Sequence, residues 1–252
     1  MAFQRALWSI EAACGPSSFP LLPPMSNLRI DRNAKTLREL TLDKLRSAIV
    51  QGYFRPGDRL VERTLCDELG VSRTVVREVL RHLETEGLVE TVARQGPIVA
   101  RLDPAQVGEI YELRSLLEAN AARACAERST PALVKQLRGI RKTVEDAFKQ
   151  DDWPRVLECT ERFYEALFDG AGKQVSLAVV KSLNARINRL RALTIAVPGR
   201  RDESNREMNA LLDAIERRDG EAASAASAAH IRRTSELALH ALEQQEQAAG
   251  SA

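Results

Sequence analysis

The chain has 252 residues, which is enough for two modest domains because domains cluster near ~100–150 residues. Hydrophobic residues make up 44% and charged residues 29%, as is typical of a soluble globular protein, while the aromatic share of only 4% favours packed helices over β-sandwiches or barrels. The net charge of +2 does not identify a partner, because a nearly neutral protein can still carry a local basic surface.

Residues 1–30 contain four prolines and only a short apolar stretch, which Glu11 interrupts. We expect a flexible N-terminal extension here, without a function of its own and with Met25 as an alternative translation start.

Residues 36–101 contain the signals of a small domain of three helices and a hairpin. The expected helices are 36–50, 61–69 and 73–86, and the expected strands are 88–92 and 97–101. Gly70 stands where a left-handed residue ends a helix, and Ser72 is a good N-cap for the helix that follows. A tight turn between two helices, followed by a hairpin, predicts a winged helix-turn-helix.

The helix at 73–86 has two distinct faces. Valine and leucine side chains form one stripe, while Arg73, Arg77 and Arg81 recur every four residues on the neighbouring face. Such arginines reach guanine edges or phosphates in the major groove. The alternative is that these arginines form only a solvent-exposed face, interspersed with the acidic residues Glu78 and Glu84. The order of turn, cap and hairpin favours DNA binding.

A stretch of about 65 residues that includes the run LGVSRTVVREVLRHLETEGLV resembles the DNA-binding domain of the GntR family of bacterial regulators. The resemblance implies double-stranded DNA as the partner. It departs from the family at Val75, where Pro or Thr is usual, and Val is expected to leave the helix intact. The residues to which the resemblance assigns DNA contacts are Arg63, Ser72, Arg73, Thr74, Arg77, Arg94, Gln95 and Gly96.

Residues 103–246 contain only helical patterns. Asp103 and Pro104 start the first helix, and further helices are expected at about 131–149, 152–169, 174–195, 203–218 and 221–246. The first helix has an apolar stripe that predicts its buried side: Val107, Ile110, Leu113, Leu116 and Leu117. The expected fold class is therefore mainly α, a winged helix-turn-helix followed by an all-α antiparallel bundle of about six helices.

The pieces YELRSLLEANAARACAE, FYEALFDGAGKQ and REMNALLDAIERRDGEAASAASAAHI resemble the FCD-type effector domain of the FadR-like branch of the same family. Many members of that branch hold a divalent metal with one Asp and three His, and the metal helps to bind a small organic acid. The corresponding positions here are Thr160, Tyr164, Met208 and His230. Because only His230 is a metal-ligand type, we expect no metal and no other cofactor.

The same four positions, together with Arg114, are the expected lining of an effector pocket in the bundle. A buried arginine requires an anion, and the two readings for Arg114 are a carboxylate of an organic-acid effector and the side chain of Glu118. A bundle that serves only as a dimerisation scaffold, without an effector, is the alternative function.

The sequence argues against an enzyme. GAGKQ is similar to a phosphate-binding loop, but Leu167 stands where the first glycine belongs, and Gln174 stands where Ser or Thr belongs. We instead expect a repressor that acts as a homodimer on a palindromic operator, because one recognition helix covers only a half-site.

The cysteines and the hydropathy pattern bear on location. No apolar run approaches the ~20 residues of a membrane helix, so no membrane partner is expected. The cysteines are too widely spaced for a zinc site and are expected to be reduced thiols, which predicts a cytoplasmic, nucleoid-associated protein. They are Cys14, Cys66, Cys125 and Cys159.

Overall fold

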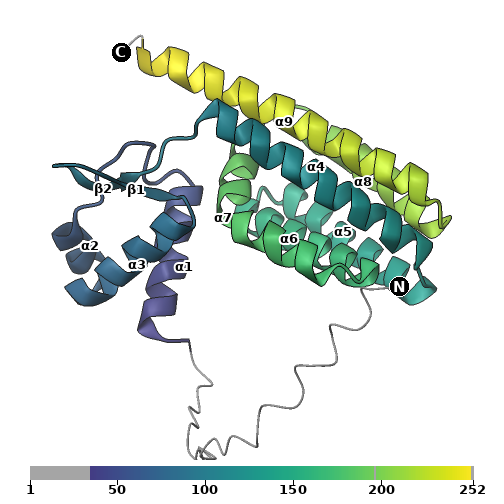
Figure 1. The fold of residues 1–252 in the computed structure, drawn as a ribbon, viewed down its shortest axis with the longest axis horizontal. Coiled ribbons are helices and arrows are strands. Elements are labelled where there is room, and N and C mark those ends of the chain that lie inside the picture. The colour runs from purple at the N-terminus through teal and green to yellow at the C-terminus, as the bar shows by residue number, and fades with distance from the viewer. Residues whose placement is uncertain (1–34, 196, 251–252) are drawn as a thin grey trace, which may run out of the picture. The chain divides into compact units, whose positions relative to one another are not determined.

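The computed structural model describes residues 35–195 and 197–250 (Figure 1). The expected N-terminal extension, with Met25, lies outside the described residues. No helix in the described ranges combines the length and the apolarity that crossing a membrane requires. The elements, in chain order, are α1 Leu37–Val50, α2 Glu62–Leu69, α3 Arg73–Thr85, β1 Val89–Val92, β2 Gly96–Val99, α4 Pro104–Glu127, α5 Pro131–Lys149, α6 Trp153–Ala171, α7 Gln174–Ile195, α8 Arg200–Glu216 and α9 Gly220–Gly250.

The three N-terminal helices and the hairpin share a core of aliphatic side chains. Val76, Val79 and Leu83 of α3 are fully buried in it, as the apolar stripe of the sequence predicts. The turn before α3 also forms as predicted, because Gly70 takes a left-handed conformation (φ +65°) and ends α2. The predicted winged helix-turn-helix is therefore confirmed.

The wing is a two-stranded antiparallel hairpin in which Val89 pairs with Val99 and Val92 pairs with Gly96. Its tip is short, and the chain reverses through Arg94, which adopts a left-handed φ of +68° that L residues rarely take. This conformation places an exposed arginine at the end of the wing.

The remaining six helices form an all-α bundle, again as predicted. Helix α4 lies beside α9 and runs in the opposite direction, and it also packs against α6, α7 and α8 (Figure 1). Large side chains such as Phe163, Phe168 and Leu190 fill the centre of the bundle. Their burial against several helices stabilises the fold, because apolar area is removed from water.

The predicted inward face of α4 was partly wrong. Leu113 and Leu116 are 44% and 64% exposed, whereas Tyr111, Arg114 and Glu118 are buried. The i, i+3, i+4 register that begins at Val107 passes through Arg114 and Glu118, and these two charges neutralise each other inside the bundle. The leucines therefore lie on the opposite side of the helix.

Candidate DNA interface and effector cavity

The N-terminal end of α3 presents an exposed polar and basic surface. Ser72 caps the helix, and its hydroxyl oxygen accepts a hydrogen bond from the N–H of Val75 at 3.4 Å. Its own hydroxyl proton remains able to reach a phosphate oxygen. Arg73 and Thr74 follow in the first turn and are exposed. Val75 leaves the helix intact, as expected.

Arg77 is held by an ion pair with the preceding helix. Its Nε lies 2.9 Å from Oε2 of Glu62, the first residue of α2. The Arg77 side chain is nevertheless 60% exposed, so most of its donors remain available. This contact links the two helices of the helix-turn-helix and limits the directions that the guanidinium explores, which prepares it for a defined base or phosphate.

The other predicted DNA contacts lie on α2 and the wing. Arg63 is exposed on α2, and Arg94 and Gln95 are exposed at the tip between β1 and β2, which Gly96 follows. Three separate elements thus contribute exposed basic side chains to the predicted interface. Their roles in DNA binding stay predictions.

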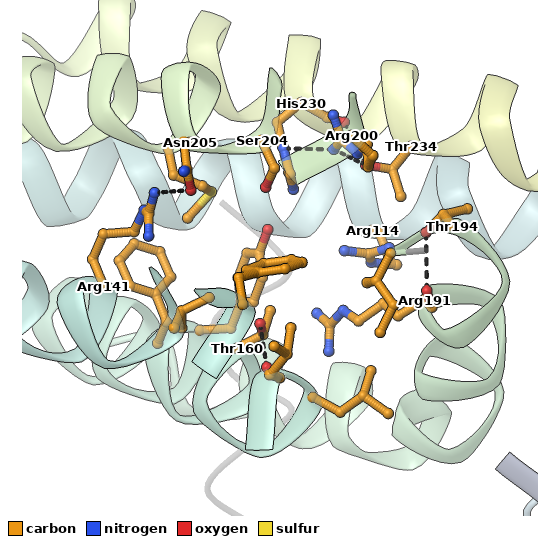
Figure 2. A pocket seen from close by; sticks show the side chains of 18 residues that line it. Arg114, Arg141, Thr160, Arg191, Thr194, Arg200, Ser204, Asn205, His230 and Thr234 are labelled. Atoms are coloured by element: carbon orange, nitrogen blue, oxygen red, sulfur yellow. Dashed lines mark hydrogen bonds between the residues drawn. The ribbon is translucent and has the colours of Figure 1, made fainter. Parts of the chain in front are cut away.

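The interior of the bundle contains a cavity of about 60 Å3, which Figure 2 shows from close by. It brings together every residue predicted for the effector site, and these come from four helices: Arg114 from α4, Thr160 and Tyr164 from α6, Met208 from α8 and His230 from α9. The sequence reasoning missed Arg141 of α5, Arg191 of α7 and Arg200 of α8, which line the same cavity.

Both readings of Arg114 bear on this cavity. Its Nε donates to Oε1 of Glu118 at 2.8 Å, so the predicted intrahelical pair is present. Its Nη1 has no hydrogen-bond partner among the described residues, although it is buried. Burial by itself lowers the pKa of Arg114, but Glu118, Tyr164 and Tyr111 together outweigh burial and raise it, so the guanidinium stays charged.

Arg200 forms the second neutralised arginine of the cavity. Its Nη1 lies 2.9 Å from Oε2 of Glu207, and its Nη2 donates to Oγ1 of Thr234 at 3.0 Å. Glu207 also contacts Nδ1 of His230 at 2.6 Å. Burial lowers the pKa of His230 and the contact with Glu207 offsets this only in part, so the imidazole is neutral near pH 7. Nη2 of Arg200 lies 3.4 Å from the same Nδ1, but the contact with Glu207 is much shorter, and because a carboxylate only accepts, it places the imidazole proton on Nδ1.

Arg141 and Arg191 differ from these two, because neither forms an ion pair with a carboxylate in the described part of the chain. Arg141 donates from Nη2 to Oδ1 of Asn205, while its buried Nε and Nη1 have no partner. Arg191 donates from Nη1 to Oδ1 of Asn188 at 3.0 Å, and its guanidinium lies 5.2 Å from the centre of the Tyr164 ring. Burial lowers the pKa of both arginines, and the charge of Arg114 lowers that of Arg191 further.

One signal in the sequence points to Arg141. It follows Leu137 by four residues and precedes Val144 by three, so it occupies an inward position on an otherwise apolar stripe. Arg200 was missed for a different reason, which is the position at which its helix begins. Helix α8 begins at Arg200 and not near residue 203, because Gly199 takes a left-handed φ of +79° just before it.

The side chains at the family's metal positions do not fit a metal ion. Thr160 already donates its hydroxyl proton to the Val156 carbonyl at 2.7 Å, and Tyr164 and Met208 supply neither a carboxylate nor an imidazole. His230 alone could still offer Nε2, but in the described ranges no group of three or more His, Cys, Asp or Glu is clustered as a metal site requires. Four arginines line the cavity, and their charges oppose a cation there.

Comparison with known proteins relates both parts of the chain to one kind of protein. The sequence model for "Bacterial regulatory proteins, gntR family" matches residues 37–99, and that for the "FCD domain" matches residues 109–233. An HTH-type transcriptional regulator of Agrobacterium vitis is 35% identical over 126 residues, which are 49% of this chain and 74% of that protein. The chain belongs to the GntR family.

Further similarities agree with this assignment. The galactonate operon transcriptional repressor of Escherichia coli K12 is 29% identical over 204 residues, covering 71% of this chain and 86% of that protein. The solved structure of McbR/YncC from E. coli has a TM-score of 0.68 at 23% identity and covers 84% of this chain and all of that one. This GntR chain is thus a DNA-binding transcription regulator with an FCD domain, and not an enzyme.

Proposed function

We propose that this GntR-family chain is a repressor whose hold on a palindromic operator is set by a small organic acid bound in the cavity of the bundle. The observation that carries the proposal is the charge of the cavity: four arginines line it, and none of the described residues that line it is Asp or Glu. Buried guanidinium groups favour a ligand with carboxylate oxygens, which they bind through charge-assisted hydrogen bonds.

Two further observations support parts of the proposal. A relative that covers most of this chain is named a repressor of an operon for galactonate, which is a sugar acid. The exposed basic side chains at the start of α3 and on the wing suit the major groove and the adjacent backbone. Arg73 and Arg77 would contact the groove, with Arg94 beside it.

Two-fold symmetry of an operator requires two recognition helices, so the proposed repressor is a homodimer. The exposed Leu113 and Leu116 on α4 offer apolar surface to a second copy. Light scattering on the purified chain tests this, and a monomer at micromolar concentration would contradict it.

The proposed effector site works without a metal ion, because the arginines supply positive charge and three of the family's four ligand positions lack ligand side chains. The test is metal analysis of protein purified without a histidine tag. We expect far less than one equivalent of zinc, nickel or manganese, and near-stoichiometric metal would overturn this part of the proposal.

A bundle that is only a scaffold is distinguished from an effector domain by ligand-dependent stability. A ligand at ~100 times its dissociation constant adds ~2.7 kcal/mol to the free energy of unfolding. We therefore expect thermal unfolding to identify at least one small organic acid that raises the unfolding temperature and changes the affinity for operator DNA. If no acid in a broad metabolite screen does so, the scaffold function stands.

A further inference from the structure

The four arginines that line the cavity fall into two classes. Arg114 is neutralised by Glu118 at 2.8 Å, and Arg200 is neutralised by Glu207 at 2.9 Å. Arg141 and Arg191 are 6% and 7% exposed, and neither has a carboxylate partner within the described residues. Two buried positive charges are therefore left without a neutralising anion.

The nearest carboxylates are engaged elsewhere. Glu145, one turn beyond Arg141 on α5, lies 2.8 Å from the ammonium group of Lys149. The charges of Glu118 and Glu161 both act on Arg191, but Glu118 is held by Arg114, and Glu161 accepts a hydrogen bond from Asn184. A buried unpaired charge is costly, because neither water nor a counter-charge stabilises it. The cavity is thus incomplete in electrostatic terms, and two negative charges would complete it.

The two uncompensated guanidinium groups lie at different ends of the cavity. Figure 2 shows Arg141 and Asn205 on one side and Arg191 with Arg114 on the other, with Thr160 between them. Arg191 and Arg114 form one cationic end, since their guanidinium carbons lie 5.2 and 6.0 Å from the centre of the same Tyr164 ring. The unpartnered Nη1 of Arg114 belongs to this end.

We infer that the effector of the proposed function is a small dicarboxylate, with one carboxylate at Arg141 and the other at Arg191 and Arg114. A single carboxylate neutralises only one end and leaves the other guanidinium buried without an anion. A dicarboxylate satisfies the unpartnered Nε and Nη1 of Arg141 at one end and the unpartnered Nη1 of Arg114 at the other. It also connects α5 to α4 and α7.

The size of the cavity limits the ligand. A volume of about 60 Å3 corresponds to about two water molecules, since each takes ~30 Å3 in the liquid. Only a short unbranched acid can enter this space, after the side chains that line it adjust, and an acyl chain or a nucleotide is too large. Apolar side chains such as Val144 and Phe148 line the cavity as well, and they suit the methylene groups between two carboxylates.

The inference is tested on the full chain with two series of probes at constant ionic strength. The first series is the unbranched dicarboxylic acids of three to six carbon atoms, and the second is the monocarboxylic acids of the same lengths. Thermal unfolding identifies the acids that bind, and titration calorimetry gives their dissociation constants. We expect at least one dicarboxylate to bind at least about tenfold more tightly than its matched monocarboxylate, because a second charge-assisted contact forms.

Variants locate the two contacts. Arg141→Gln and Arg191→Gln are each expected to weaken binding of the best dicarboxylate at least about tenfold. The matched monocarboxylate occupies one end only, so one of the two variants should weaken its binding less. Lys142→Gln is the matched control, because it removes the same charge from the exposed position beside Arg141. Its affinity for the dicarboxylate should stay within about twofold of the parent's.

Each outcome decides between the two proposals. Monocarboxylates that bind as tightly as dicarboxylates at every length would overturn the two-ended ligand and leave an organic-acid effector in place. If no acid of either series raises the unfolding temperature, the dicarboxylate inference fails, whereas the organic-acid effector fails only if the broad metabolite screen also finds no stabilising acid. The comparison of the two series uses the unaltered chain, so it stands even if a variant does not fold.

Discussion

Arg114 donates from Nε to Oε1 of Glu118 at 2.8 Å inside the bundle, and the two side chains are 1% and 0% exposed. The two residues lie one turn apart on α4 and occupy two of its buried positions. Each charge there depends on the other, since removing one partner of a buried pair leaves the other uncompensated.

Glu118→Ala is therefore expected to lower the free energy of unfolding by ~3–5 kcal/mol. Urea denaturation followed by circular dichroism measures the change. Glu112→Ala, at an exposed position of the same helix, is the control and should stay within ~0.5 kcal/mol of the parent chain. A loss below ~1 kcal/mol for Glu118→Ala would show that Arg114 finds another anion or water and that the pair is not required.

Arg141 leads to the opposite expectation for stability. Its buried Nε and Nη1 have no hydrogen-bond partner among residues 35–195 and 197–250, so the unliganded protein carries an uncompensated charge at this position. Arg141→Met retains an unbranched apolar side chain and should raise the free energy of unfolding by ~1–2 kcal/mol when no ligand is present. Urea denaturation without the acid measures the expected gain in stability. Urea denaturation with the best-binding acid should show that the acid no longer stabilises the variant. A variant that is clearly less stable than the parent would assign Arg141 a structural role.

Arg77 is the residue of α3 whose DNA contact is easiest to test. Arg77→Ala should cost ~1–3 kcal/mol of specific binding, with relaxed selectivity at one base if the contact is to a base edge. Fluorescence anisotropy on operator variants measures both quantities. Lys142→Gln removes one positive charge from the bundle and is the control for net charge. If Arg77→Ala binds the operator like the parent, Arg77 is not part of the interface.

The pKa of His230 predicts how stability depends on pH. Burial lowers this pKa below the ordinary value of 6.5. Glu207 raises the pKa, but only in part, and the positive charges of Arg200 and Arg114 lower it further. The unfolded chain then binds a proton at a higher pH than the folded chain does, so stability falls as the pH drops below ~6.5, by up to ~1.4 kcal/mol per pH unit. Glu207, whose pKa lies below its ordinary value, stays ionised in this window.

His230→Gln removes the titrating group and keeps a hydrogen-bond donor for Glu207. The unfolding free energy of the parent chain should therefore decrease more between pH 7 and pH 5 than that of His230→Gln. Denaturation curves at the two pH values give the difference. Parallel losses in the two proteins would mean that His230 does not titrate in this range.

Much of the fold is predictable because local signals and tertiary packing agree. Ser72 has the side chain of an N-cap and Gly70 has the freedom for a left-handed turn, and both act as expected in the helix-turn-helix. The resemblance to the family predicts four residues of the cavity, because the matching positions face the inside of the family's bundle. They are Thr160, Tyr164, Met208 and His230.

The remaining features depend on contacts between distant segments. Sequence periodicity treats leucine as buried and arginine as exposed, so it places Leu113 and Leu116 inside and overlooks Arg141 and Arg191. Whether an arginine is buried depends on what it meets in three dimensions, and Asn205, the partner of Arg141, is 64 residues away in the chain. An arginine on an apolar stripe is the local signal for such a position.

The most direct test of the central claim is a mobility shift with the DNA that flanks the protein's own gene, at two salt concentrations. The account predicts tight binding to one palindromic fragment, which weakens steeply as salt rises because phosphate contacts release counterions. Addition of the best-binding acid should change the affinity for that fragment. Equal binding to this fragment, to random DNA and to fragments recovered by a genome-wide pull-down would contradict a sequence-specific regulator.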